Sequence, residues 1–127
     1  MFKLSQTSID RLQGVDDRII KIIRLALEIT KIDFGIPEHG GLRTEQEQKA
    51  LCDRGLSECD GYINKSYHQT GKAFDMFAYV DGASWDRGYM TQVAAAILQA
   101  ASMLGYKLEW GGHWKNFVDL PHFQLKD

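Results

Sequence analysis

The sequence lacks a long apolar run. Its most apolar stretch, Ile19 to Ile29, is interrupted by three charged residues, so we expect no transmembrane helix and no membrane insertion. The first residues also lack the apolar core of a secretory signal, so we expect no signal peptide. Nor is there a block of five like charges, and 15 Lys and Arg against 17 Asp and Glu give a net charge of −2. This balance argues against a nucleic-acid partner.

Cysteine and proline are also scarce. The two cysteines, Cys52 and Cys59, are seven residues apart, which matches neither a CxxC metal knuckle nor a disulfide-rich secreted scaffold. We therefore expect two reduced thiols. The chain has 127 residues, of which 44% are hydrophobic and 25% charged, and it contains no internal repeat. These values predict one globular domain over residues 1–127.

Three segments carry helix signals. Apolar residues at three- and four-residue spacing predict an amphipathic helix from Asp16 to Thr30 and a long core helix from Ser84 to Leu104. Thr44 followed by Glu47 forms a capping box, in which the hydroxyl and the carboxylate satisfy free N–H groups, and this predicts a helix from about Glu45 to Arg54.

The remaining apolar segments are short and fit strands. We expect strands over Phe34–Pro37, Ala73–Val80, Tyr106–Trp110 and His122–Leu125. The Gly, Asn, Ser and Asp content between Gly55 and Ser66 predicts a loop. Helices mixed with short, locally connected strands indicate an α+β fold rather than a doubly wound sheet.

Three side chains in these segments can serve as metal ligands. His68 ends a loop, Asp75 lies in the strand that follows, and Gly71 permits the tight turn between them. His122 comes much later but begins a strand that could pair beside the first. A catalytic zinc site takes three protein ligands and keeps one position open, and two His with one Asp meet that need. A lone His and Asp at this spacing also occur as a surface pair, so the spacing alone leaves both readings open.

Two motifs together resemble those of the LAS-type zinc peptidases. The stretch Ser66 to Asp75 reads SxHxxGxAxD, and Asp119 to His122 reads DxxH. This family includes D-alanyl-D-alanine carboxypeptidases and phage L-alanyl-D-glutamate endopeptidases, and the stretches Gly41–Thr44 and Trp110–Gly112 resemble the endopeptidase branch. The resemblance implies a small α+β domain of the hedgehog and DD-peptidase type, with a short antiparallel sheet packed against helices.

The resemblance also implies roles for individual residues. It implies that His68, Asp75 and His122 bind one Zn²⁺ ion, that Asp119 is the catalytic carboxylate, and that Arg43 anchors the substrate. A regular strand would place Asp119 and His122 on opposite faces, because their separation is odd. We expect Pro121 to make the start of this strand irregular, so that both side chains reach the site.

Further substrate contacts are expected from Ser66, Trp110 and His113. Each has an alternative: a Ser before a turn often bonds only to backbone, large aromatics most often fill the core, and His113 can be structural. The three tryptophans, which include Trp85 and Trp114, thus form either a platform for sugar or peptide or part of the core. His113 stands where the endopeptidase branch commonly has an acid, and we expect substrate preference or pH dependence to differ there.

The resemblance implies a zinc-dependent peptidoglycan hydrolase that cleaves the L-alanyl-D-glutamate bond of stem peptides. It would act as a monomeric phage endolysin, held in the host cytoplasm until release to the cell wall causes lysis. One alternative is a D-alanyl-D-alanine dipeptidase or carboxypeptidase. Another is a non-catalytic module that binds zinc or a cell-wall peptide, for which a proton-shuttling Asp119 would have no use.

Overall fold

The computed structural model describes residues 1–55 and 66–126. Cys52 is a free cysteine, and Cys59 and most of the loop expected between Gly55 and Ser66 lie outside the described residues. None of the helices in the described ranges is long and apolar enough to span a membrane.

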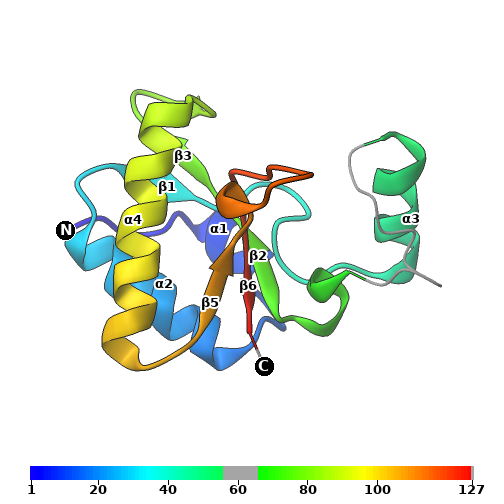
Figure 1. Ribbon diagram of the computed structural model, residues 1–127, viewed down its shortest axis with the longest axis horizontal. Coiled ribbons are helices and arrows are strands. Elements are labelled where there is room, and N and C mark those ends of the chain that lie inside the picture. Colours follow the sequence, from blue (N-terminus) through cyan, green and yellow to red (C-terminus); the bar gives the residue numbers. More distant parts are fainter. Residues whose placement is uncertain (56–65, 127) are drawn as a thin grey trace.

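The described chain contains α-helices, short 3₁₀ helices and two small sheets (Figure 1). The α-helices are α1 (Gln6–Arg11), α2 (Asp17–Ile29), α3 (Glu45–Asp53) and α4 (Arg87–Leu104), and the 3₁₀ helices are η1 (Tyr67–Thr70) and η2 (Gly111–His113). The strands are β1 (Asp33–Gly35), β2 (Ala73–Asp75), β3 (Phe77–Tyr79), β4 (Ala83–Ser84), β5 (Leu108–Trp110) and β6 (His122–Leu125). They form two antiparallel sheets, in the orders β1–β3–β4 and β2–β6–β5.

Helices α2 and α4 pack against each other and supply much of the core. The apolar stripe of α2 includes Ile22 and Ile23, and α4 contributes Val93 and Ile97, all of them buried. Burying such aliphatic side chains contributes about 1.5–3 kcal/mol each relative to exposure. The two helices form the wall that supports the sheets on one side of the molecule (Figure 1).

Aromatic pairing fixes the register of the β2–β6–β5 sheet. Phe74 and Phe123 lie directly opposite each other in the β2–β6 ladder, and their rings stack with centroids 5.1 Å apart. Trp110 of β5 stacks on the other side of Phe123 at 6.3 Å. All three rings are buried, and a slip of one residue would turn them out of the core.

The α+β prediction is confirmed, with differences in detail. The single strand expected over Ala73–Val80 is wrong, because it is two strands in two different sheets. Met76 lies between the two strands, and its N–H donates to the Pro121 carbonyl. The chain then enters β3, which pairs with β1. The expected helix start at Ser84 is also corrected: Ser84 lies in β4, and the Asp86 carboxylate caps α4 by accepting from the Tyr89 N–H.

The capping box predicted for α3 is present and suggests a stability test. The Thr44 hydroxyl accepts from the Glu47 N–H, and the Glu47 carboxylate accepts from the Thr44 N–H. We expect Thr44→Ala to lower the free energy of unfolding by about 1 kcal/mol, measured by urea denaturation, because one helical N–H loses its partner. Thr44→Ser keeps the hydroxyl and is the control. Equal stability of the Ala variant and the wild type would contradict a capping role.

Candidate metal centre and active site

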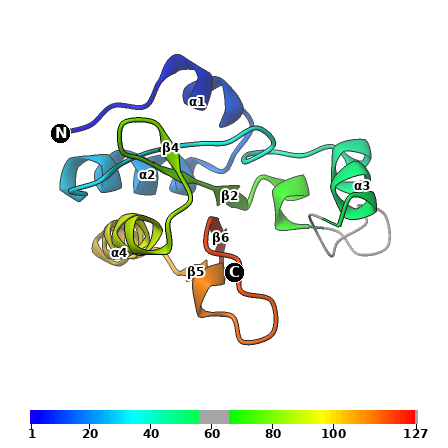
Figure 2. The ribbon, with the colours of Figure 1, turned by 90° about the horizontal axis from the view of Figure 1, so that it is seen from above.

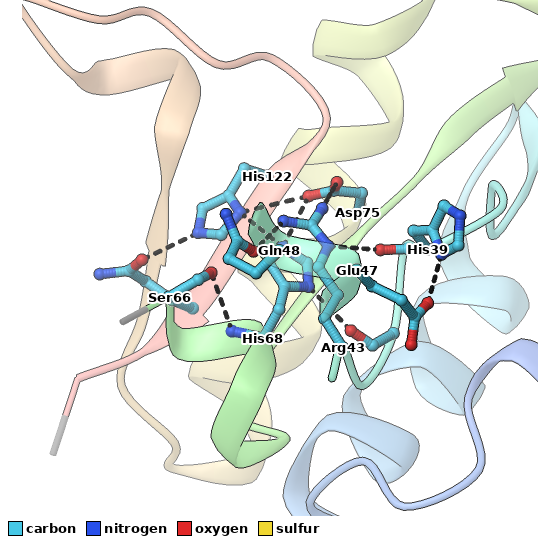
Figure 3. A network of polar contacts seen from close by, with 10 residues as sticks. His39, Arg43, Glu47, Gln48, Ser66, His68, Asp75 and His122 are labelled. Atoms are coloured by element: carbon cyan, nitrogen blue, oxygen red, sulfur yellow. Dashed lines mark hydrogen bonds and ion pairs between the residues drawn. The ribbon is translucent and has the colours of Figure 1, made fainter. Parts of the chain in front are cut away.

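Strand pairing and a short 3₁₀ helix bring three polar side chains together (Figure 3). Asp75 ends β2 and His122 begins β6, and the two residues are direct partners in the antiparallel ladder. Side chains at directly opposite ladder positions lie on the same face of a sheet. His68 comes from η1, which begins at the capping residue Ser66 and ends at Gly71 with a φ of +74°. Glycine adopts that left-handed turn without strain.

The atoms that face one another form a nearly equilateral triangle. His68 Nε2 lies 3.1 Å from His122 Nδ1, and Asp75 Oδ1 lies 3.2 Å from each of these nitrogens. Both rings are buried, and the carboxylate is largely buried between them. Among the described residues, these three form a group whose ligand atoms are close enough to hold one metal ion.

The opposite side of each ring is held by a further hydrogen bond. His68 Nδ1 lies 2.9 Å from the Gly41 carbonyl oxygen, so a donating Nδ1–H leaves Nε2 free as a ligand. His122 Nε2 lies 2.8 Å from Gln124 Oε1, which leaves Nδ1 free in the same way. Gln124 is itself fixed by donating to Glu109 Oε2 at 3.0 Å. Such outer partners set the tautomer and orientation of metal-binding imidazoles.

The surroundings of Asp75 and His122 shift the pKa of each of these two groups. Burial alone would raise the pKa of the Asp75 carboxyl, but His68 and His122 outweigh it and hold this pKa well below its usual range. Burial would lower the pKa of the His122 ring, but the hydrogen bond and negative charge of Asp75 raise it above its ordinary value. The carboxylate is therefore ionised, as a metal ligand must be.

Arg43 contacts Asp75 directly. Its Nη2 donates to Asp75 Oδ2 at 3.0 Å, its Nε donates to the His39 carbonyl at 2.7 Å, and its Nη1 donates to Gln48 Oε1 at 3.0 Å. The side chain is only 10% exposed. Gln48 is buried in α3, so the guanidinium is fixed between α3 and β2. The geometry makes Arg43 a positioning partner of Asp75, and the substrate contact expected of it stays a prediction.

Asp119 lies beside this centre, on a turn rather than on the strand. The Asp119 carbonyl accepts from the His122 N–H at 3.2 Å, and its own N–H donates to the Gly111 carbonyl at 3.0 Å. The chain turns at residues 120 and 121, so the irregular approach expected from Pro121 is present. A Cβ on Gly111 would lie 2.4 Å from the Asp119 carbonyl oxygen, and only glycine permits this close approach.

The Asp119 carboxylate faces the cleft, and no hydrogen-bond partner for it exists among the residues that the structure describes. Burial raises the pKa of Asp119 above its usual value, and the negative charge of Asp75 adds to this effect. The basic groups nearby oppose it. A carboxylate with a raised pKa is a better proton acceptor than an ordinary one.

The metal group and Asp119 open into one cleft of about 610 Å³. Ser66 lines it, and its hydroxyl also accepts from the His68 N–H. Trp110 is 7% exposed and does not appear on the cleft wall, because its ring packs in the core and its Nε1–H donates to the Leu120 carbonyl at 2.7 Å. His113 is exposed and rests edge-on against Trp110, also outside the cleft lining. The structure thus brings Ser66, but neither Trp110 nor His113, to the centre.

Sequence reasoning missed the residues that orient the ligands. Gln48 and Gln124 belong to no motif, and Gly41 belongs to a stretch that resembles the endopeptidase branch but gives no sign that its carbonyl faces His68. One signal was available for Gln124: it lies two residues after His122, and alternate residues of a strand share a face. Gln48 is four residues after the helix cap, but only the packing of α3 shows that it meets Arg43.

The fold and the site define a small α+β domain in which two histidines and one aspartate, a group that could hold one metal ion, line a cleft. The family model of phage L-alanyl-D-glutamate peptidase matches residues 1–125. The chain therefore belongs to the phage L-alanyl-D-glutamate peptidase family.

Curated relatives support this assignment. The L-alanyl-D-glutamate peptidase of Escherichia phage T5 is 34% identical over 127 residues, covering 98% of this chain and 90% of the relative. That of Listeria phage A118 is 37% identical over 85 residues, covering 66% of this chain but only 28% of the relative. Peptidoglycan L-alanyl-D-glutamate endopeptidase CwlK of Bacillus subtilis is 31% identical over 106 residues, covering 74% of this chain and 61% of the relative.

Two solved structures are similar. The L-Ala D-Glu endopeptidase ChiX of Serratia marcescens matches with a TM-score of 0.84 and 36% identity, covering 98% of this chain and 90% of that one. DacB of Streptococcus pneumoniae matches with a TM-score of 0.52 and 19% identity over 92% of this chain and 69% of that one, which shows a shared fold alone.

The contacts of Arg43 give a prediction about metal affinity. We expect Arg43→Lys to weaken the binding of a divalent metal ion to this group by about 10- to 100-fold, because a single ammonium cannot hold Asp75 together with the other two acceptors. Competition with a chelator of known affinity measures this change. Arg18→Lys, which alters an Arg–carboxylate pair with Asp16 outside the cleft, is the control. Unchanged affinity with a raised KM would instead make Arg43 a substrate anchor.

Proposed function

We propose that this protein is a zinc-dependent peptidoglycan hydrolase that cleaves the L-alanyl-D-glutamate bond of stem peptides. Residues 1–127 would act as one zinc peptidase domain and as a monomeric phage endolysin, released from the host cytoplasm to the cell wall at lysis. The observation that carries the proposal is the His68–Asp75–His122 triangle with the Asp119 carboxylate beside it in one cleft. The names of the family and of the relatives supply the bond.

The donor set fits zinc. Zn²⁺ binds nitrogen and oxygen ligands at about 2.0–2.2 Å in tetrahedral sites, so neighbouring ligand atoms lie about 3.3–3.6 Å apart. The triangle, with sides of 3.1 and 3.2 Å, is close to one face of such a tetrahedron. Arg43 holds Asp75 Oδ2, so the carboxylate offers a single oxygen, Oδ1, to the ion. Three protein ligands leave a fourth position to the cleft, as catalytic zinc sites require.

The chemistry divides between the ion and the protein. Bound Zn²⁺ supplies a Lewis acid, which polarises a carbonyl group and makes water a nucleophile near neutral pH. Asp119 accepts a proton from the attacking water and donates it to the leaving amine of D-glutamate. Its raised pKa suits both roles, and its backbone bonds to Gly111 and His122 keep it at the cleft.

Digestion of murein tests the proposed bond. We expect the purified protein to release stem-peptide fragments with a new amino-terminal D-glutamate and to leave L-alanine on the glycan, as measured by product masses. Chelation should abolish release and Zn²⁺ should restore it, while circular dichroism shows an intact fold, because α2, α4 and the aromatic ladder form the core without the metal group.

Other products of this digestion would identify the alternatives. Release of D-alanine or D-alanyl-D-alanine would indicate a carboxypeptidase or dipeptidase. Retention of the protein on murein without any product, together with unfolding on chelation, would indicate a binding module with a structural metal.

Asp119 gives a separate prediction. We expect Asp119→Asn to bind Zn²⁺ like the wild type but to hydrolyse murein about 10²- to 10⁴-fold more slowly, because the amide cannot transfer the proton. Asp81→Asn is the control, since Asp81 is exposed outside the cleft lining and its φ of +55° suits asparagine equally. A wild-type rate in the Asp119 variant would remove this residue from the mechanism.

A further inference from the structure

A large aromatic side chain on the cleft wall has no part in the chemistry described above. Trp85 follows β4 directly and precedes Asp86, the capping residue of α4. It lines the same cleft as Asp119 and His122, yet 54% of its surface is exposed. An indole left in solvent beside an active site is a common mark of ligand binding, because tryptophan offers a large apolar area at low conformational cost.

The backbone on both sides of Trp85 is fixed. Ala83 and Ser84 pair with β3, and the Asp86 N–H donates to the Ser84 hydroxyl at 3.3 Å. The Asp86 carboxylate in turn accepts from the Tyr89 N–H at 3.1 Å. A binding group on regular elements is held more rigidly than one on a loop.

A second ring supports the indole. The ring of Phe77 lies with its centroid 6.0 Å from that of Trp85, at an interplanar angle of 47°. Phe77 is confined in its turn by Gly35, where an added Cβ would lie only 2.8 Å from the Phe77 ring tip. Trp85 is therefore braced from β3 while much of its surface remains open.

Both α3 and the segment that carries Trp85 contribute residues to the cleft wall. Seen from above, β4 and the start of α4 are on one side of β2 and β6, and α3 is on the other (Figure 2). Leu51 of α3 lines the cleft as Trp85 does, so residues from both sides of β2 and β6 contribute to its wall. Trp114, by contrast, packs at 5.2 Å from the His122 ring and so lies at the reacting centre itself.

The proposed substrate has a sugar close to the bond that is cut. This step rests on the proposed function: in peptidoglycan the L-alanine of the stem peptide is joined by an amide to the lactyl group of N-acetylmuramic acid. The scissile bond is therefore one residue away from a pyranose ring. The C–H groups on the face of such a ring pack well on a flat indole, while its hydroxyls stay in water.

We propose that Trp85 forms a saccharide subsite, which stacks on the N-acetylmuramic acid that carries the stem peptide. The enzyme then recognises the glycan-linked peptide as well as the L-alanyl-D-glutamate bond. Phe77 and the β3–β4 pairing hold the indole ready for the sugar.

Two substrates with one peptide test the subsite. The first is N-acetylmuramyl-L-Ala-D-Glu-diaminopimelate, and the second is the same tripeptide with an N-acetyl group in place of the sugar. For the wild type we expect kcat/KM to be about two- to tenfold higher on the muramyl substrate, as an aromatic stacking contact provides. Trp85→Ala should lose this preference through a raised KM and should cleave the sugar-free peptide at the wild-type rate.

Matched variants separate the subsite from a general effect. Tyr79→Ala removes another exposed aromatic, 51% accessible on β3 and outside the cleft lining, and should leave both rates unchanged. Trp85→Tyr keeps a flat ring and should retain part of the preference for the muramyl substrate. This variant tests the subsite if the alanine variant fails to fold.

The outcomes are distinct. Equal kcat/KM of the wild type on the two substrates would overturn the subsite while leaving the proposed peptidase intact. An equal loss on both substrates in Trp85→Ala would overturn it too and would assign Trp85 to the peptide. Failure of the wild type to cleave either substrate would remove the proposed function, and the subsite with it.

Discussion

The antiparallel pairing of β2 with β6 is the contact on which the rest of the site depends. It places the carboxylate of Asp75 opposite the ring of His122, and the stacked pair of Phe74 and Phe123 holds that register in the core. The two pairs lie on opposite faces of the sheet. A slip by one residue would move the side chains of the slipped strand to the wrong face, and both pairs would be lost together. Packing energy and ligand geometry are thus fixed by the same ladder.

The buried group of His68, Asp75, His122 and Arg43 is stable because the negative charge of Asp75 is compensated by hydrogen bonds and ion pairs with the other three. Two imidazoles surround the ionised carboxylate, and Arg43 pairs with its second oxygen. Unpaired buried charges cost several kcal/mol, whereas a connected network satisfies each group. The outer partners come from separate segments, namely the turn at Gly41, helix α3 and strand β6. The site therefore forms only when these segments have folded together.

Local signals predicted those elements whose causes are local. The apolar stripe of α2 and the capping box of α3 are properties of neighbouring residues, and both helices begin and end within one residue of the prediction. The division of residues 73–80 into two strands was not foreseeable in this way. It depends on pairing with two distant segments, because residues 73–75 pair with β6 and residues 77–79 pair with β1.

The candidate site shows the same division. Two motifs, a resemblance and the chemistry of zinc ligands were enough to name His68, Asp75 and His122, which the structure brings together. They were also enough to expect an irregular turn at Pro121. The place of the tryptophans was not decided by sequence: Trp110 fills the core, while Trp85 lines the cleft.

By itself, the sequence determined the residue types that can bind a metal, the capped and amphipathic helices, and the family. Only the tertiary structure decided which nitrogen of each histidine faces the centre, that Arg43 supports Asp75, and which aromatic rings reach the cleft. The physical reason is that these features arise from hydrogen bonds and packing between segments distant in the chain. The spacing of residues along one segment does not specify their partners on another segment.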